Sequence, residues 1–198
     1  MSSRTGWGWR TLQAATLVLL AVGFVCVGEG AWIHVKAYVA QVAIARAWRR
    51  AQAGAPDAKP WPWADTRPVA KLTVSRGAHE LMVLEGSNGR NLAFGPTHDP
   101  TSVLPGERGN SVIEGHRDTH FAFLRDLRIG DTLRVDLADG RSSSFAIVDL
   151  RIVDSRRWRI ALDVDAPRLT LVTCYPFDAV RSGGPLRMVI TAAVVAEG

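Results

Sequence analysis

The sequence predicts an all-β domain, either a barrel or a sandwich, that follows an N-terminal apolar helix. From residue 69 onward the apolar residues fall in short runs of strand length, separated by turn-forming residues at intervals of about 8 to 12 positions. Helical periodicity is nearly absent from this part of the chain. Short strands joined by frequent turns are typical of closed or two-layered sheets. One long apolar run near the N-terminus has a different pattern, because no turn-forming residues divide it into strands.

The composition is that of one ordinary domain with appendages. The chain has 198 residues, of which 47% are hydrophobic, enough to form a core. Its net charge is +5, from 24 Lys and Arg residues and 19 Asp and Glu residues. The basic residues are scattered, neither gathered in a dense block nor interleaved with aromatic residues. We therefore expect no nucleic-acid partner, and the positive charge suits a face near an anionic membrane.

Residues 1–10 are short and polar, and residues 11–30 are predicted to be a transmembrane anchor. The run 11–28 is almost wholly apolar, and at about 1.5 Å per residue it covers about 27 Å, close to the ~30 Å of a hydrocarbon core. Trp9 and Trp32 lie at its flanks, where indole rings favour the membrane interface. A cleaved signal peptide has a shorter apolar core and a small-x-small site, which the residues after the run do not supply. The sequence thus predicts an uncleaved anchor.

Residues 31–68 are predicted to form a stalk helix followed by a linker. Five side chains of the first part fall at roughly helical spacing: Val35, Val39, Val42, Ala43 and Trp48. From residue 51 the chain becomes rich in Pro and Ala, which is a linker composition. Trp61 and Trp63 interrupt this linker, and we expect both indole rings to pack on the domain surface. The β domain is expected over 69–198.

Seven apolar runs of this domain are predicted to be strands: 69–74, 80–84, 111–113, 131–137, 144–153, 169–174 and 186–195. The segments 85–91 and 95–110 are rich in Gly, Pro, Asn and Asp, which predicts loops. Asp139 and Gly140 form a hairpin turn dipeptide between two of the strands. Residues 121–127 have helical spacing and are expected to form one or two turns.

The sixth predicted strand ends at Cys174. Proline follows at position 176 and has no N–H donor, so the strand is expected to stop there and leave the thiol at its rim. The other cysteine, Cys26, lies in the predicted membrane span, so the two thiols cannot pair within one molecule. A lone thiol in an oxidising compartment is either a reactive nucleophile or a small buried hydrophobic side chain. The strand by itself leaves both interpretations open.

A thiol nucleophile needs a group that manages protons and a donor for the oxyanion. His116 is the best candidate for the first role, because it follows a predicted strand and Gly115 and lies in a polar segment. Arg187 is the candidate for the second role, in an otherwise apolar strand. An inward guanidinium would have to meet an anion or a carbonyl there. An outward position for Arg187 is equally open.

Three segments together resemble the sortases, a family of membrane-anchored cysteine transpeptidases. Residues 170–174 (TLVTC) are similar to the family's TLxTC signature. Residues 115–121 (GHRDTHF) resemble its histidine segment, and residues 186–190 (LRMVI) resemble its arginine strand. The three occur in the order and spacing of the family, across roughly 69–195. Residues 61–70 further resemble the class GN sortases of Gram-negative bacteria.

The resemblance implies a closed eight-stranded β-barrel with short helices and a site at one end. Cys174 would attack an LPXTG-like C-terminal sorting signal of a secreted protein and form a thioester. Arg187 would donate to the oxyanion, and His116 would protonate the departing amine and later deprotonate the amine acceptor. Thr173 would bind substrate through its backbone or hydroxyl, and His120 would be structural. No cofactor is expected and no metal-binding residue is assigned, while the sequence leaves any metal dependence open.

The resemblance also implies a membrane topology, which charge does not decide, because basic residues flank the span on both sides. Sortases have a type II topology. The N-terminus would lie in the cytoplasm, the chain would cross the inner membrane once, and the catalytic domain would be periplasmic.

The residues leave three alternatives. A metal-dependent hydrolase would use His116, Asp118, His120 and Cys174, since His-x-x-x-His fits one face of a helix, although Gly115 and the strand before it disfavour a helix there. A non-catalytic, membrane-anchored binding module would not need the thiol. An L,D-transpeptidase of cell-wall cross-linking normally carries a Ser-His-Gly-Cys run, which this sequence lacks.

Overall fold

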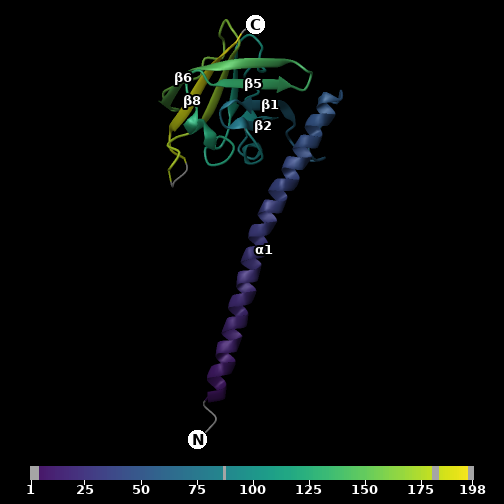
Figure 1. Cartoon of the computed structure of the whole chain (residues 1–198), viewed down its shortest axis with the longest axis vertical. Coiled ribbons are helices and arrows are strands. Elements are labelled where there is room, and N and C mark those ends of the chain that lie inside the picture. The colour runs from purple at the N-terminus through teal and green to yellow at the C-terminus, as the bar shows by residue number, and fades with distance from the viewer. Residues whose placement is uncertain (1–4, 87, 180–182, 196–198) are drawn as a thin grey trace. The chain divides into compact units, whose positions relative to one another are not determined.

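The computed structural model describes residues 5–86, 88–179 and 183–195. The chain divides into two compact units, Met1–Gln41 and Val42–Gly198. One continuous helix, α1 (Thr5–Gln52), contains both the predicted anchor and the predicted stalk (Figure 1). Its part from Leu12 onward is long and apolar enough to cross a membrane, and apolar side chains such as Phe24 are exposed on it.

The buried stripe of the stalk differs from the predicted one. Of the five side chains at helical spacing, Val35 and Val39 are 50% and 58% exposed. Burial concentrates instead in the last turns of α1, which belong to the same compact unit as the strands. The buried side chains there have i, i+3, i+4, i+7 spacing: Ile44, Ala47, Trp48 and Ala51.

The linker is attached to the barrel by one of its two tryptophans and by an arginine. The Trp61 ring packs edge-on against Phe94, with centroids 5.1 Å apart. Trp63 is 82% exposed, so the prediction that both rings pack was wrong for this residue. Arg67 donates two hydrogen bonds, of 2.8 and 2.9 Å, to the Glu85 carboxylate. Because a forked guanidinium–carboxylate pair fixes direction as well as distance, this pair holds the end of the linker where the first strand begins.

Eight strands close into a barrel in the order β1-β2-β3-β4-β7-β8-β6-β5 (Figure 1). Their bounds are β1 (Pro68–Val74), β2 (His79–Glu85), β3 (Thr97–His98), β4 (Asn110–Glu114), β5 (Thr132–Leu137), β6 (Ser142–Asp154), β7 (Arg168–Cys174) and β8 (Leu186–Val194). Neighbours β2/β3 and β4/β7 are parallel, and the other neighbours are antiparallel. The closed eight-stranded barrel is therefore confirmed.

Only β3 lies in a segment that was predicted to be a loop. Two residues carry no detectable alternation, so a strand of this length leaves no pattern in the sequence. Three short 3-10 helices accompany the barrel: η1 (Arg76–Ala78), η2 (Asn91–Ala93) and η3 (Ala122–Asp126). The last of these is the helical turn expected within 121–127.

The interior of the barrel takes alternate residues of each strand. On β7 the side chains of Leu169 and Leu171 enter the main core. Because strand side chains alternate between faces, Val172 and Cys174 belong to the outer face. Val172 accordingly joins a second, smaller cluster on the outer face, which also contains Val112 of β4. This alternation keeps the candidate nucleophile out of the core.

Candidate active site

Cys174 is the last residue of β7 and is partly buried. Strand β7 lies between β4 and β8. On the β8 side, Cys174 is the register partner of Arg187. Directly opposed residues of antiparallel strands project from the same face of a sheet. The candidate nucleophile and the candidate oxyanion donor are therefore neighbours on the outer face of the barrel.

On the other side of Cys174 lies the segment that carries His116. Glu114, the last residue of β4, is the parallel register partner of Val172, and the N–H of Gly115 donates to the Val172 carbonyl at 3.1 Å. His116 follows two residues after Glu114, so its segment begins where β4 ends, next to the end of β7. The three candidate residues thus lie at one end of three adjacent strands, although the sequence separates His116 from Arg187 by most of the domain.

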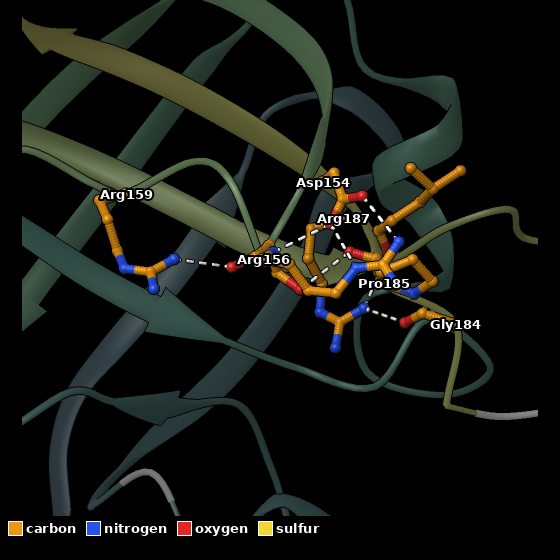
Figure 2. Close-up of polar contacts among 8 residues, drawn as sticks. Asp154, Arg156, Arg159, Gly184, Pro185 and Arg187 are labelled. Carbon is orange, nitrogen blue, oxygen red and sulfur yellow. Dashed lines mark hydrogen bonds and ion pairs between the residues drawn. The ribbon is translucent and has the colours of Figure 1, made fainter.

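Arg187 is half-buried on the outer face and meets carbonyl groups. One guanidinium nitrogen, Nη1, donates to the carbonyls of Gly184 at 2.7 Å and Leu186 at 2.8 Å, and Figure 2 shows the guanidinium directed at Gly184. Of the two positions considered for Arg187, the outward one is correct. A guanidinium carries five N–H donors, so these contacts leave donors for a further acceptor.

Thr173 faces the other way from Cys174. Its side chain is 2% exposed, and its hydroxyl donates to the Gly115 carbonyl at 2.7 Å. The hydroxyl contact with substrate that the sequence suggested is thus taken by Gly115, which leaves only the backbone of Thr173 for such a role. Gly115 is itself tightly enclosed, since a Cβ at this position would lie 2.7 Å from the Phe121 ring.

The two histidines of the segment differ in environment. His116 is exposed, whereas His120 is half-buried. Burial lowers the pKa of His120, a hydrogen bond with the Ala93 backbone opposes that shift, and nearby His116 adds to the lowering. Across the residues that the structure describes, no three His, Cys, Asp or Glu side chains gather where they could hold a metal ion. The metal-dependent alternative therefore has no set of ligands in the described parts of the chain.

A cavity of about 300 Å³ lies on the outer face of the barrel, and Arg187 is the candidate site residue that lines it. Its apolar lining comes from one valine of each of four strands and from three side chains of the connection after β6: Val112, Val153, Val172, Val189, Trp158, Ile160 and Leu162. Arg187 and Arg159 line it as well, and the Arg159 guanidinium donates to the Ser155 carbonyl at 2.8 Å, which Figure 2 shows as a contact with a backbone oxygen. The cavity is therefore an apolar groove with charged groups at its edges.

Two acidic side chains, Glu114 and Asp99, also line this groove. Burial raises the pKa of Glu114, and Asp99 raises it further, while Arg187 lowers it. Sequence reasoning did not single out Glu114 or the apolar side chains after β6. The alternation of Trp158, Ile160 and Leu162 is a period-two signal that identifies a one-sided extended segment. Glu114 carries no such signal, because its burial depends on the loops around it.

A family model, a curated relative and solved structures match parts of this chain. The family model described as the sortase domain matches residues 72–195. Sortase D of Bacillus subtilis (strain 168) is 38% identical over 112 residues, which are 56% of this chain and 56% of that protein. The chain thus matches little more than half the length of this curated relative.

Two solved structures are similar in fold. Sortase A from Corynebacterium diphtheriae superposes with a TM-score of 0.61 at 22% identity, over 69% of this chain and 64% of that chain. The Clostridium perfringens sortase D5 transpeptidase superposes with a TM-score of 0.58 at 21% identity, over 66% and 80%. Neither comparison names class GN, so that subgroup stays a prediction. Because the family model covers more than half of the chain, the chain belongs to the sortase family.

Proposed function

We propose that this chain is a membrane-anchored cysteine transpeptidase that cleaves an LPXTG-like C-terminal sorting signal of a secreted protein and transfers the acyl part to an amine. The observation that carries the proposal is the position of Cys174 at the end of β7, with Arg187 opposite it on β8 and the His116 segment along its other side. Membership of the sortase family, whose members are cysteine transpeptidases, supports the same reaction.

In the first half of the proposed reaction, the Cys174 thiolate attacks the carbonyl carbon of the scissile peptide bond. The carbonyl oxygen takes the negative charge, and Arg187 donates a hydrogen bond to it. The carbon–nitrogen bond then breaks, and His116 in its imidazolium form gives a proton to the departing amine. The acyl group remains on Cys174 as a thioester.

In the second half, the amine acceptor attacks the thioester carbonyl. The neutral imidazole of His116 takes the proton of the attacking amine, the new amide forms, and the Cys174 thiolate leaves. The enzyme returns to its starting protonation state. The two halves therefore use the same three side chains in opposite order.

The outer-face groove supports a peptide substrate of this kind. Apolar side chains line it, which suits the Leu and Pro side chains of an LPXTG-like signal. Val172 is two residues before Cys174 on the same face, so an extended peptide along β7 would place its apolar residues beside this valine when its scissile bond meets the thiol.

The helix α1 supports membrane anchoring. This helix is long enough to span a membrane, and its apolar side chains are exposed. Such an exposed apolar surface is stable only when lipid or another apolar surface covers it. In the proposed topology the N-terminus is cytoplasmic, α1 crosses the inner membrane once, and the barrel is periplasmic.

The test uses the full chain in detergent micelles with an LPXTG peptide and hydroxylamine as the amine. We expect a thioester adduct on Cys174 by mass spectrometry when the peptide is added alone, and release of the hydroxamate product when hydroxylamine follows. Cys26→Ala is the matched control, because it removes the only other thiol of the chain and should leave both signals intact. Cys174→Ala should abolish both, and turnover that survives this change would refute the proposal.

A further inference from the structure

The residue after His116 is buried although its neighbours are not. The Arg117 side chain is only 7% exposed, whereas His116 and Asp118 are both exposed. A guanidinium is costly to bury unless hydrogen-bond acceptors meet it. Arg117 therefore has a function inside the protein, and the proposed reaction does not use it.

The acceptors of Arg117 show what it holds. Its Nη2 donates to the carbonyl of Ala179 at 2.8 Å, and its Nε donates to the Asp118 carboxylate at 3.2 Å. Ala179 is five residues after Cys174, in the segment that leaves β7. Arg117 thus connects the histidine segment with the chain that follows the candidate nucleophile.

This connection complements the contacts on the other side of His116. Gly115 is tied to β7 twice, by its N–H to Val172 and by its carbonyl to the Thr173 hydroxyl. His116 therefore lies between Gly115, which is bonded to β7 before Cys174, and Arg117, which is bonded to the segment after Cys174. The same β7–β8 connection contains Gly184 near its end, and the Gly184 carbonyl accepts from Arg187.

We propose, on the basis of the function proposed above, that Arg117 is a positioning residue that holds the segment after Cys174 against the histidine segment and so sets the distance between the Cys174 thiol and the His116 imidazole. Its hydrogen bonds to the Ala179 carbonyl and the Asp118 carboxylate are contacts within the protein. Its effect passes through the backbone on both sides of the site, because each end of the link lies within a few residues of a reacting side chain.

The experiment measures how alkylation of Cys174 by iodoacetamide depends on pH in the full chain in detergent micelles. Mass spectrometry of the Cys174 peptide reads this thiol separately from Cys26. The rate at which a thiol is alkylated depends on the groups around it, so the profile is sensitive to the position of the His116 imidazole. His116→Ala defines the profile that results from complete loss of the imidazole.

We expect the profile of Arg117→Met, and that of the polar variant Arg117→Gln, to shift towards that of His116→Ala. Arg117→Lys should lie in between, because one ammonium donor can still reach the carbonyl without the forked geometry. Arg125→Met is the matched control, since Arg125 donates at 3.1 Å to a carbonyl of its own 3-10 turn, that of Ala122. Its profile should equal that of the unmodified chain.

Peptide turnover provides the second measurement. Displacing a reacting group by about 1 Å costs up to about 100-fold in rate, so Arg117→Met should lower kcat by about 10- to 100-fold with little change in KM. Alkylation needs no peptide, so the profile tests Arg117 even if no peptide is cleaved. Profiles of Arg117→Met and Arg117→Gln that coincide with that of the unmodified chain would overturn the proposal.

Discussion

Replacing Thr173 by valine removes one hydroxyl and keeps the branched shape of the side chain. In the barrel this hydroxyl donates to the Gly115 carbonyl at 2.7 Å, and the side chain is 2% exposed. A buried carbonyl left without its donor costs about 1–3 kcal/mol. At about 4 °C per kcal/mol for a domain of this size, we expect Thr173→Val to lower the Tm by about 4–12 °C. Tryptophan fluorescence of the full chain in detergent micelles measures this shift.

Strand β7 offers a matched control three residues earlier. The hydroxyl of Thr170 is equally buried and donates to the Asn110 side chain at 2.8 Å, so Thr170→Val should lower the Tm by a similar amount. Only the Thr173 bond reaches the segment that carries His116. Thr173→Val should therefore also change the alkylation of Cys174 and slow peptide turnover, whereas Thr170→Val should leave the alkylation profile unchanged.

The comparison of the two variants can refute this reasoning in two ways. An unchanged Tm for Thr173→Val would mean that the hydrogen bond to Gly115 does not stabilise the barrel. An equal loss of stability in both variants, with the same Cys174 alkylation profile as the unmodified chain, would mean that the bond does not position the histidine segment.

Three further predictions follow from the site. Burial raises the pKa of Glu114, so its ionised form destabilises the barrel increasingly as the pH rises above about 4.5, its ordinary pKa. Glu114→Gln should therefore have a higher Tm than the unmodified chain at pH 8 and the same Tm at pH 4. If the variant and the unmodified chain had equal Tm values at both pH 4 and pH 8, this prediction would be contradicted. Arg187→Lys loses the planar fork of donors and should lower kcat for the LPXTG peptide at least about 100-fold, which steady-state kinetics measures; an unchanged kcat would exclude Arg187 as the oxyanion donor. Gly115→Ala would put a Cβ 2.7 Å from the fully buried ring of Phe121, so it should lower the free energy of unfolding by about 1–3 kcal/mol. Urea denaturation measures this change, and an unchanged free energy of unfolding would show that the ring can move aside.

Local pattern was sufficient for most of the barrel. Strands β7, which ends at Cys174, and β8, which begins at Leu186, were recognisable because turn residues bound their runs of apolar and β-branched residues. This signal depends only on residues that are neighbours in the sequence. Strand β3 and the exposure of Trp63 were not recognisable. Pairing with distant strands alone defines a two-residue strand, and whether an indole ring finds a neighbour depends on how the linker runs over the barrel.

The chemistry of the site was readable in a similar, partial way. Cys174, His116 and Arg187 stand out as residue types in unusual places: a thiol at a strand end, an imidazole after a strand and Gly115, and a guanidinium in an apolar strand. Arg117 did not stand out, since an arginine in a polar segment has no sequence feature that indicates burial. Its acceptor, Ala179, is more than sixty residues away.

The sequence by itself determined which segments become strands, where the apolar helix lies, and which side chains have the chemistry of an acyl transfer. These properties follow from composition and periodicity over a few neighbouring residues. Only the tertiary structure decided that Arg187 faces outward opposite Cys174, that the Thr173 hydroxyl bonds Gly115, and that an apolar groove is lined by Val172 and Arg187. The physical reason is that register between strands, and the face on which each side chain emerges, are set when distant segments pair and the barrel closes.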